Sequence, residues 1–498
     1  MPVTRKIKAL DGSEVEFVDE VIGSGGMKDV YFSPDRTYVV AFFRDKQDAN
    51  AKDRLINIAG PYRERIYNQV GGEYWKDKFC WPTKVVEYEG RLGLVAPVYP
   101  NQFFFQFGSK NNDFLGIRGR EKEGKWFASA NNQSKFLDDR ERGNWMQYFR
   151  ICILLSRSVR RMHAAGLAHS DLSYKNVLVD PVSGGAAIID IDGLVVPGKY
   201  PPDVVGTPDF IAPEVMATNH LHKGDPARKL PSRTTDLHAL AVLVYMYLLY
   251  RHPLRGGKIH DADPQQDEEW AMGDKALFIE HPTDKSNRPN LNDIKPSYLP
   301  WADITKRPYT VTGPYLKALF DKAFIDGLHN PGLRPSADEW EQALVKTVDL
   351  MQPCQNLNCD QKWFVFDNST KPICPFCSTP VRGDLPILNL YSARTEGNFK
   401  PDNHRLMVYT NQYIYGWHAS NLVFPNERLT DGQRKPVGYF VFHGGRWVLV
   451  NQLLPDLTDV GKKRVIPIGE MLELYEGQQI LLSKETGGRL AVVQLVTN

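Results

Sequence analysis

Three polar residues close together in the chain could carry out phosphoryl transfer. Asn176 is the fifth residue after Asp171, and Asp190 ends an apolar run that follows a turn rich in Pro and Gly. The pattern predicts two short strands joined by a turn, with Asp171, Asn176 and Asp190 meeting at their outer ends. One carboxylate could then orient an acceptor hydroxyl, while the asparagine and the second carboxylate hold Mg²⁺ on a triphosphate.

The same stretch resembles the catalytic and metal-binding loops of eukaryotic-type protein kinases. The letters HSDLSYKN match the kinase pattern H-R-D-L-x-x-x-N except at Ser170, which takes the place of the arginine. That arginine usually receives an activation-loop phosphate, so we expect an activity that does not depend on this switch. Asp192 stands where the D-F-G pattern has glycine.

The resemblance implies roles for five residues of this region. Asp171 would position the acceptor hydroxyl, Lys175 would contact the γ-phosphate, and Asn176 and Asp190 would bind Mg²⁺ or Mn²⁺. Thr207 resembles the threonine that hydrogen-bonds the catalytic aspartate, and its Gly-Thr-Pro context favours serine or threonine over tyrosine as the acceptor. The implied reaction transfers the ATP γ-phosphate to a protein hydroxyl and could include autophosphorylation.

Three further residues resemble fixed points of the lower kinase lobe. Asp236 corresponds to the buried aspartate that braces the catalytic-loop backbone, and Arg334 corresponds to the arginine that pairs with Glu214 of the A-P-E motif. Because such a pair is buried, loss of one partner should cost several kcal/mol.

A glycine-rich turn precedes the catalytic stretch and consists of Gly23, Ser24, Gly25 and Gly26. Backbone N–H groups in such a turn can approach a phosphate closely. Any tight hairpin can use glycines in this way, so its place ahead of the catalytic residues is what favours a nucleotide loop. Lys28 replaces the third glycine of the G-x-G-x-x-G pattern.

The resemblance also places the adenine ring of ATP. It would lie against Val30 and Ala41 and accept a backbone hydrogen bond near Val98, since Pro97 has no N–H to donate.

The cation that a kinase carries on its third strand is missing from the pattern. Arg44 lies one residue beyond the strand YVVAFF, so strand alternation turns it away if Ala41 faces adenine. Either Arg44 is used after a one-residue slip, or Lys28 or Lys46 supplies the charge, or the cation is absent and activity is crippled. Glu64 is the candidate helix glutamate for pairing with this cation, and a solvated surface position is its equally weighted alternative.

Two polar segments interrupt the kinase pattern. We interpret residues 100–144 as a disordered surface insertion, with a substrate-contacting flap as the alternative. Residues 255–310 resemble bacterial kinases encoded beside stress or tellurite-resistance genes. That resemblance implies a metal-dependent protein phosphatase and a von Willebrand A-domain protein as partners, besides the protein substrate.

Four cysteines form a metal-binding pattern near residue 360. Cys354 and Cys359 are followed, after fourteen residues, by Cys374 and Cys377. Two such thiolate pairs predict tetrahedral coordination of Zn²⁺. We expect the metal to stabilise a ribbon too small to hold a core of its own, because no βαβ pattern around CPFC indicates a redox role.

Residues 384–498 contain short alternating runs separated by turn signals, which predict a small β-sandwich. GGRWVLVNQ followed by EGQQILLS resembles forkhead-associated domains, which bind phosphothreonine. His418-Ala419-Ser420 matches part of their phosphate site, and the arginine is missing. A phosphothreonine reader and a protein-docking module both remain open.

The 498 residues carry a net charge of +2, and no apolar run is long enough to cross a bilayer. With only six cysteines, we predict a cytoplasmic protein without nucleic-acid or membrane partners. The expected class is α+β: a bilobal kinase fold (lobes 1–99 and 100–350), a zinc ribbon (351–383) and an all-β, forkhead-associated-like sandwich (384–498). The alternative function is a pseudokinase scaffold whose tail docks signalling partners.

Overall fold

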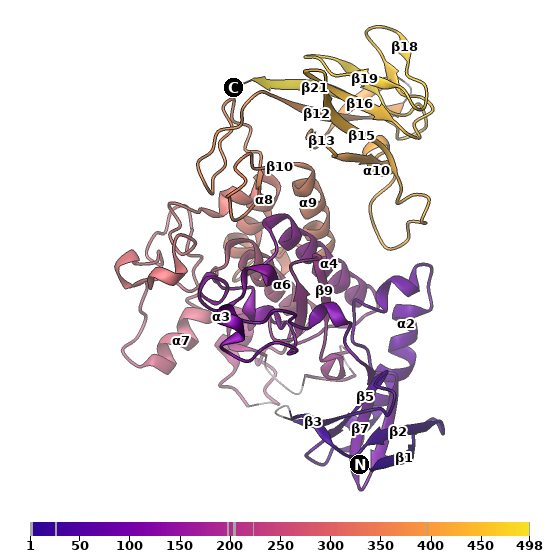
Figure 1. Ribbon diagram of the computed structural model, residues 1–498. Coiled ribbons are helices and arrows are strands. Elements are labelled where there is room, and N and C mark those ends of the chain that lie inside the picture. Colours follow the sequence, from indigo (N-terminus) through magenta and orange to yellow (C-terminus); the bar gives the residue numbers. More distant parts are fainter. Residues whose placement is uncertain are drawn as a thin grey trace. The chain divides into compact units, whose positions relative to one another are not determined.

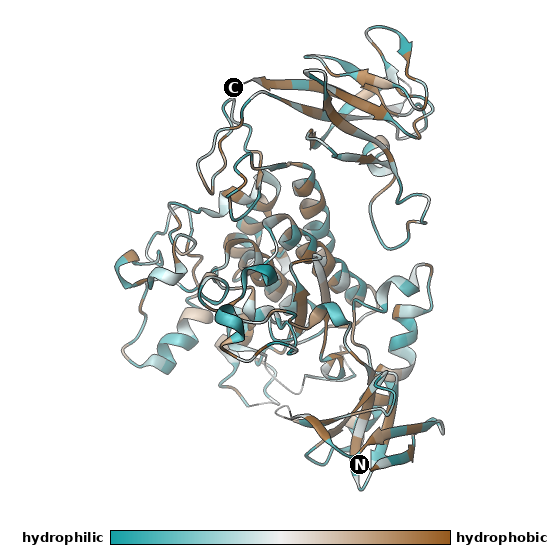
Figure 2. Cartoon of the chain, in the orientation of Figure 1, coloured by the Kyte–Doolittle hydropathy of each residue, from teal (hydrophilic) through white to brown (hydrophobic). Residues whose placement is uncertain are grey.

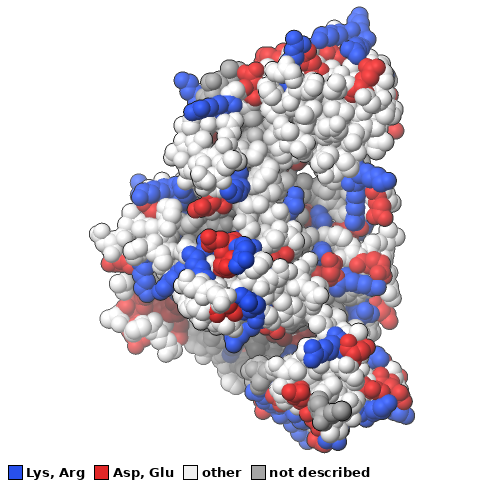
Figure 3. All heavy atoms as spheres, in the orientation of Figure 1, with Lys and Arg blue, Asp and Glu red and all other residues white. Residues whose placement is uncertain are grey.

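The computed structural model describes residues 3–24, 27–196, 199–202, 206–222, 224–395 and 397–497 (Figure 1). The chain divides into two compact units. The first comprises Met1–Gly143, Gln147–Pro308 and Ala318–Glu341, and the second Asn144–Met146, Tyr309–Lys317 and Gln342–Asn498. Side chains of both signs are mixed over the face shown in Figure 3, in keeping with the small net charge. The described helices include no candidate for a membrane span.

The first unit contains an antiparallel sheet of strand order β3-β4-β5-β7-β6, preceded by the hairpin β1–β2. The bounds are β1 (Thr4–Lys8), β2 (Glu14–Val18), β3 (Val21–Ser24), β4 (Lys28–Phe32), β5 (Tyr38–Phe43), β6 (Lys84–Tyr88) and β7 (Arg91–Pro97). Alternation along β5 sends Val40 and Phe42 into a core with Phe17. Ala41 and Phe43 therefore point to the opposite face, which borders a cleft.

Helix α6 is the central helix of the first unit, because it is apolar on all sides and buried along nearly its whole length. It begins with a capping box formed by Ser232 and Thr235. The short strands β8 (Val177–Asp180) and β9 (Gly185–Ile188) form the antiparallel pair that the sequence predicts. The helix bounds are α1 (Ala49–Asn57), α2 (Arg63–Tyr67), α3 (Lys110–Asp113), α4 (Trp145–Ala164), α5 (Pro213–Thr218), α6 (Arg233–Leu249), α7 (Pro264–Met272), α8 (Pro314–Asp321) and α9 (Ala337–Asp349).

The prediction of a disordered insertion at residues 100–144 is wrong. Three of its phenylalanines are at most 2% exposed. The ammonium of Lys122 is buried between Glu141 at 3.0 Å and Asp180 at 2.8 Å. The apolar residues of this segment follow neither a helix nor a strand period, so the sequence pattern did not reveal that they are buried.

A buried ion pair links the start of α5 to the segment before α9. The Arg334 guanidinium, whose side chain is 1% exposed, donates to both carboxylate oxygens of Glu214 at 2.8 and 2.7 Å. It also donates to the backbone carbonyls of Thr234 and Gly327. One side chain therefore satisfies acceptors from three separate segments of the lower half of this unit.

Arg334→Ala should lower the free energy of unfolding by about 3–5 kcal/mol, because Glu214 would keep a partly buried charge without its partner. Urea denaturation followed by tryptophan fluorescence measures this change. Lys6→Ala is the matched control, since Lys6 is 73% exposed and pairs with Glu16 at 2.7 Å. It should change stability by less than about 1 kcal/mol. Equal losses in the two variants would contradict the argument.

The second unit joins a two-stranded ribbon to two facing sheets. Their strand orders are β13-β12-β21-β20-β17-β18 and β14-β15-β16-β19, and both contribute to one core. Figure 2 shows hydrophobic stretches along these strands. The C-terminal region is therefore a β-sandwich, as predicted. The bounds are β10 (Met351–Pro353), β11 (Trp363–Val365), β12 (Asp384–Thr395), β13 (Asn398–Met407), β14 (Tyr413–Tyr415), α10 (Gly416–Ala419), β15 (Pro436–His443), β16 (Arg446–Asn451), β17 (Thr458–Asp459), β18 (Arg464–Val465), β19 (Met471–Glu473), β20 (Gln479–Leu481) and β21 (Arg489–Thr497).

Candidate active site

The structure brings Asp171, Asn176 and Thr207 together. Oδ1 of Asp171 accepts hydrogen bonds from the backbone N–H of Thr207 at 2.7 Å and from its hydroxyl at 2.9 Å. Oδ2 of Asp171 accepts one from the side-chain amide of Asn176 at 2.9 Å. Because this bond uses the amide nitrogen, the amide oxygen of Asn176 is the atom that could coordinate a hard cation.

Asp236, near the start of α6, holds the backbone that leads into Asp171. Its carboxylate accepts the N–H groups of His169 at 2.8 Å and Ser170 at 3.1 Å, and it contacts Nε2 of His163 at 3.0 Å. Ser170 has a φ of +70°, a conformation that is unusual for a residue with a Cβ. The buried carboxylate therefore stabilises a strained turn that aims Asp171.

Asp190, which follows β9, lies with Asp192 around the ammonium group of Lys28. That group donates to both oxygens of Asp192 at 2.7 Å and to Asp190 at 3.3 Å. Lys28 starts β4 and lies opposite Phe43 in the register with β5. Strand pairing thus places the Lys28 ammonium beside the loop that carries Asp190 and Asp192.

The three charges shift one another's ionisation. Burial raises the pKa of Asp190, and the neighbouring Asp192 carboxylate raises it further. Burial also opposes the ionisation of Asp192, but the Lys28 ammonium outweighs it and lowers the pKa of that carboxyl. Burial disfavours the charged form of Lys28, yet the two carboxylates raise its pKa. Lys28 and Asp192 are thus the tighter pair, and Asp190 is the carboxylate that an added cation would stabilise most.

Arg44 and Glu64 do not reach the cleft, and this corrects the prediction that they contact the nucleotide. The Arg44 guanidinium donates to Asp29 at 2.9 Å, and Arg91 donates to the same carboxylate at 2.7 Å. Lys28 and Asp29 are neighbours on β4, so alternation turns one side chain into the cleft and the other away from it.

Glu64 is exposed and follows a break between helices α1 and α2. A π-helical turn at Ile58–Tyr62, with non-helical torsions at Gly60, separates α1 from α2 and leaves Glu64 on the outer surface of α2. Arg54 of α1 lines the cleft instead. Sequence reasoning missed Arg54, although its place beside the buried Leu55 on one short helix was a usable signal.

The cleft has a volume of about 640 Å³. Phe43 lines it without filling it, and the Lys28 ammonium lies 5.2 Å from the centre of the Phe43 ring. Burial raises the pKa of the Cys80 thiol in its wall to about 12, so that group is uncharged. The predicted nucleotide-contacting residues in the lining are Gly23, Val30, Ala41, Val98 and Asp190.

The remaining predicted residues have different positions. Ser24 ends β3, and Gly25 and Gly26 lie outside the described residues. Lys175 is exposed and lines a neighbouring groove, not the cleft.

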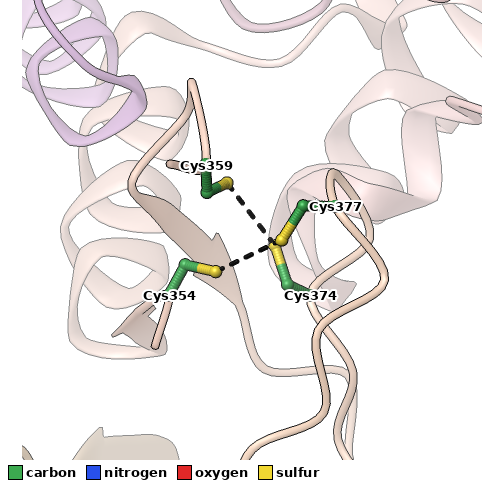
Figure 4. A group of neighbouring side chains, drawn as sticks. All are labelled: Cys354, Cys359, Cys374 and Cys377. Carbon is green, nitrogen blue, oxygen red and sulfur yellow. Dashed lines mark hydrogen bonds between the residues drawn. The ribbon is translucent and has the colours of Figure 1, made fainter. Parts of the chain in front are cut away.

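The four predicted zinc ligands converge in the second unit (Figure 4). All four sulfur atoms lie within 4.8 Å of one another. Sγ of Cys354 lies 3.5 Å from that of Cys377, and Sγ of Cys359 lies 3.9 Å from that of Cys374. Tetrahedral Zn–S bonds of about 2.3 Å require sulfur separations of roughly 3.8 Å, so this cluster fits a zinc ion.

Comparisons with known proteins find relatives of this chain among protein kinases. Residues 123–339 match the family model of the protein kinase domain. The chain is 32% identical over 146 residues to serine/threonine-protein kinase PknD of Chlamydia abortus, covering 24% of this chain and 14% of that protein. It is 30% identical over 263 residues to PknD of Chlamydia pneumoniae, covering 48% and 24%.

A human relative, serine/threonine-protein kinase H1, is 31% identical over 134 residues, covering 23% of this chain and 29% of that protein. The chain thus spans less than a third of the length of each of these relatives. Residues 123–339 are thus similar to a protein kinase domain, and the three relatives named above are serine/threonine protein kinases.

Proposed function

We propose that this chain is an ATP-dependent serine/threonine protein kinase. The observation that carries the proposal is the Asp171 carboxylate, which Thr207 and Asn176 fix from two sides. A general base or hydroxyl-orienting group must be held in one geometry before substrate arrives. A scaffold has no need to retain all three of Asp171, Asn176 and Asp190.

Each residue acts through an atom with a defined position. Asp171 receives the hydrogen bond of the acceptor hydroxyl, and Thr207 keeps its carboxylate from rotating. The Asn176 amide oxygen and Asp190 would hold Mg²⁺ or Mn²⁺, which would neutralise charge on the phosphates. Lys175 contacts the γ-phosphate from the exposed side of the same loop.

The nucleotide would occupy the cleft of about 640 Å³. Val30 and Ala41 provide apolar walls for the adenine ring. The proposed hinge donor is the backbone N–H of Val98, which must exchange its long hydrogen bond to the Thr37 carbonyl, 3.5 Å, for one to adenine. Gly23, which lines the cleft, would approach the phosphates.

The phosphate cation in this proposal is Lys28, the alternative to Arg44 that the strand register favours. Its ammonium lies in the cleft between two carboxylates of the metal-binding loop. Asp192 then takes the part that Glu64 was expected to play, because it orients the cation. A lysine ammonium suits this position, since it binds phosphate as a point charge from many directions.

The second candidate is a pseudokinase scaffold, and one observation favours it. The Lys28 ammonium contacts Asp190 at 3.3 Å, so the phosphate cation and a metal ligand neutralise each other without nucleotide. Binding of ATP with a metal ion must replace this contact.

Transfer of radiolabelled phosphate from ATP to a general protein substrate, and to the chain itself, separates the two candidates. The wild type should transfer phosphate with Mg²⁺ or Mn²⁺, and Asp171→Asn should fall to background because an amide cannot accept the hydroxyl proton. Absence of transfer by the wild type with both metals would leave only the scaffold.

The tail is part of the same proposal. We infer that residues 384–498 form a forkhead-associated-like sandwich that docks proteins, including a phosphatase and a von Willebrand A-domain partner. In this proposal the sandwich follows kinase lobes 1–99 and 100–350 and a zinc ribbon (351–383). His418 is 2% exposed and contacts Asp349, which favours docking over a phosphothreonine site built on this histidine. Calorimetry of the full chain with a phosphothreonine peptide tests this choice, and no heat of binding is expected.

A further inference from the structure

A second large hollow lies beside the catalytic loop in the first unit. This groove has a volume of about 1100 Å³ and is bordered by residues 115–136, by Tyr174 and Lys175, and by residues 250–302. Tyr174 and Lys175 belong to the loop between Asp171 and Asn176. A peptide whose hydroxyl reaches Asp171 can therefore extend directly into the groove.

Cationic side chains outnumber carboxylates in the lining of the groove, which includes six Lys or Arg residues and three Asp residues. Lys175, Lys258 and Lys295 line it, and none of them forms a salt bridge with a carboxylate of the residues that the structure describes. Asp209 in the wall is already engaged, since its carboxylate accepts hydrogen bonds from Arg255 at 2.6 Å and from the Tyr174 hydroxyl at 3.1 Å. Asp267 and Asp293 also line the groove, where their carboxylates accept hydrogen bonds from the His260 backbone N–H and the Asn290 side-chain amide. The excess of cationic side chains in the lining favours an anionic occupant.

The groove also exposes apolar surface. The Ile259 side chain in its lining is 79% exposed, and Leu115 and Tyr298 are each 37% exposed. Exposed apolar side chains gathered in a concave site mark a surface that another molecule covers. Because three lysines surround this surface, we expect the molecule that covers it to carry negative charge.

We propose that the groove binds the segment next to the acceptor hydroxyl of the protein substrate, and that this segment is acidic and carries an apolar side chain. The inference rests on the proposed kinase function and deepens it, because it defines the substrate class. The carboxylates of the segment pair with Lys258 and Lys295, and its apolar side chain packs against Ile259. Lys175, on the catalytic loop, faces the end of the substrate segment that is nearest to the acceptor hydroxyl.

Fluorescence anisotropy with the full chain tests the binding step without ATP. The probes are two labelled peptides that differ only in carrying glutamates or glutamines around one serine and one leucine. An exposed ion pair contributes about two- to threefold to affinity, so the pairs with Lys258 and Lys295 should together make the glutamate peptide bind about four- to ninefold more tightly. This preference should fall as salt rises, because exposed charges are screened.

The charge-reversal variant Lys258→Glu with Lys295→Glu should bring the ratio of the two affinities close to one. The control variant Lys8→Glu with Lys84→Glu, in strands β1 and β6, makes the same change in net charge and should leave the ratio of the two affinities unchanged. Equal affinities of the wild type for the two peptides, or a preference that survives in the groove variant, would overturn the inference.

Phosphate transfer to the same peptides separates this inference from the proposed function. If the chain prefers the glutamate peptide through Lys258 and Lys295 but transfers no phosphate, the docking groove is supported and the kinase function is rejected. If phosphate is transferred to both peptides with equal kcat/KM, the kinase function is supported and the groove is rejected as the determinant of specificity.

Discussion

Lys28→Met should reduce phosphate transfer by about 100- to 1000-fold, the range expected when one preorganised charge loses its contact with the transition state. Lys28 is the cation that strand pairing brings to the cleft, and Asp192 holds its ammonium at 2.7 Å. Methionine keeps the length and apolar stem of lysine, so the packing over Phe43 survives while the charge is lost. Initial rates with radiolabelled ATP, over a range of nucleotide concentrations, measure the effect on kcat and KM separately.

Arg44→Met is the matched control, because it removes a cation from the same sheet at a site directed away from the cleft. Arg44 is 40% exposed and pairs with Asp29, so its loss should change the transfer rate by less than about threefold. Lys28→Arg keeps the charge and should restore part of the activity. The assignment is wrong if Arg44→Met abolishes transfer and Lys28→Met does not.

The residues of the catalytic loop could be placed from the sequence because short local motifs fix their geometry. Asp171 and Asn176 are five positions apart in one tight loop. The bridge from Asp171 to Thr207 joins two such motifs, and each motif defines the backbone of its own segment. Residue type and spacing are sufficient for such sites, since few loop conformations present both side chains to one point.

The identity of the phosphate cation could not be settled from the sequence, because it depends on pairing between strands. Lys28, Arg44 and Lys46 were all within reach in the chain. The register that sets Lys28 opposite Phe43 favours Lys28, and a one-residue slip would have turned every side chain of β5 to the other face. The prediction that Glu64 pairs with the phosphate cation was wrong for a related reason, since the break at Ile58–Tyr62 changes which face of the helix points inward.

The order within residues 100–144 was hidden for a different physical reason. Its buried phenylalanines are held by irregular turns that have no hydrophobic period, and Lys122 is buried only because two acidic residues meet it from distant positions. Composition suggested a solvated segment, whereas tertiary contacts made those charges part of the interior.

Removal of zinc should unfold the ribbon of the second unit and leave the first unit folded. Structural zinc contributes on the order of 10 kcal/mol of folding free energy in small domains. The ribbon has only the pair β10–β11 as regular structure, so it cannot replace this contribution with a core. Mass spectrometry of metal content should give one zinc ion per chain, and hydrogen exchange of residues 351–383 should rise after treatment with a strong chelator.

The variants Cys374→Ser and Cys80→Ser make the zinc argument specific to the cluster. Cys374 lies 3.9 Å from Cys359, so its loss should empty the site and reproduce the exchange pattern of the chelated protein. Cys80 lies in the cleft of the first unit and donates to the Pro97 carbonyl, a bond that serine can replace, so metal content should not change. A cluster held by disulfides would have sulfur separations near 2.05 Å and would respond to reductant, not to a chelator. Loss of the ribbon on reduction alone, with no zinc found in the untreated protein, would therefore reject the metal centre.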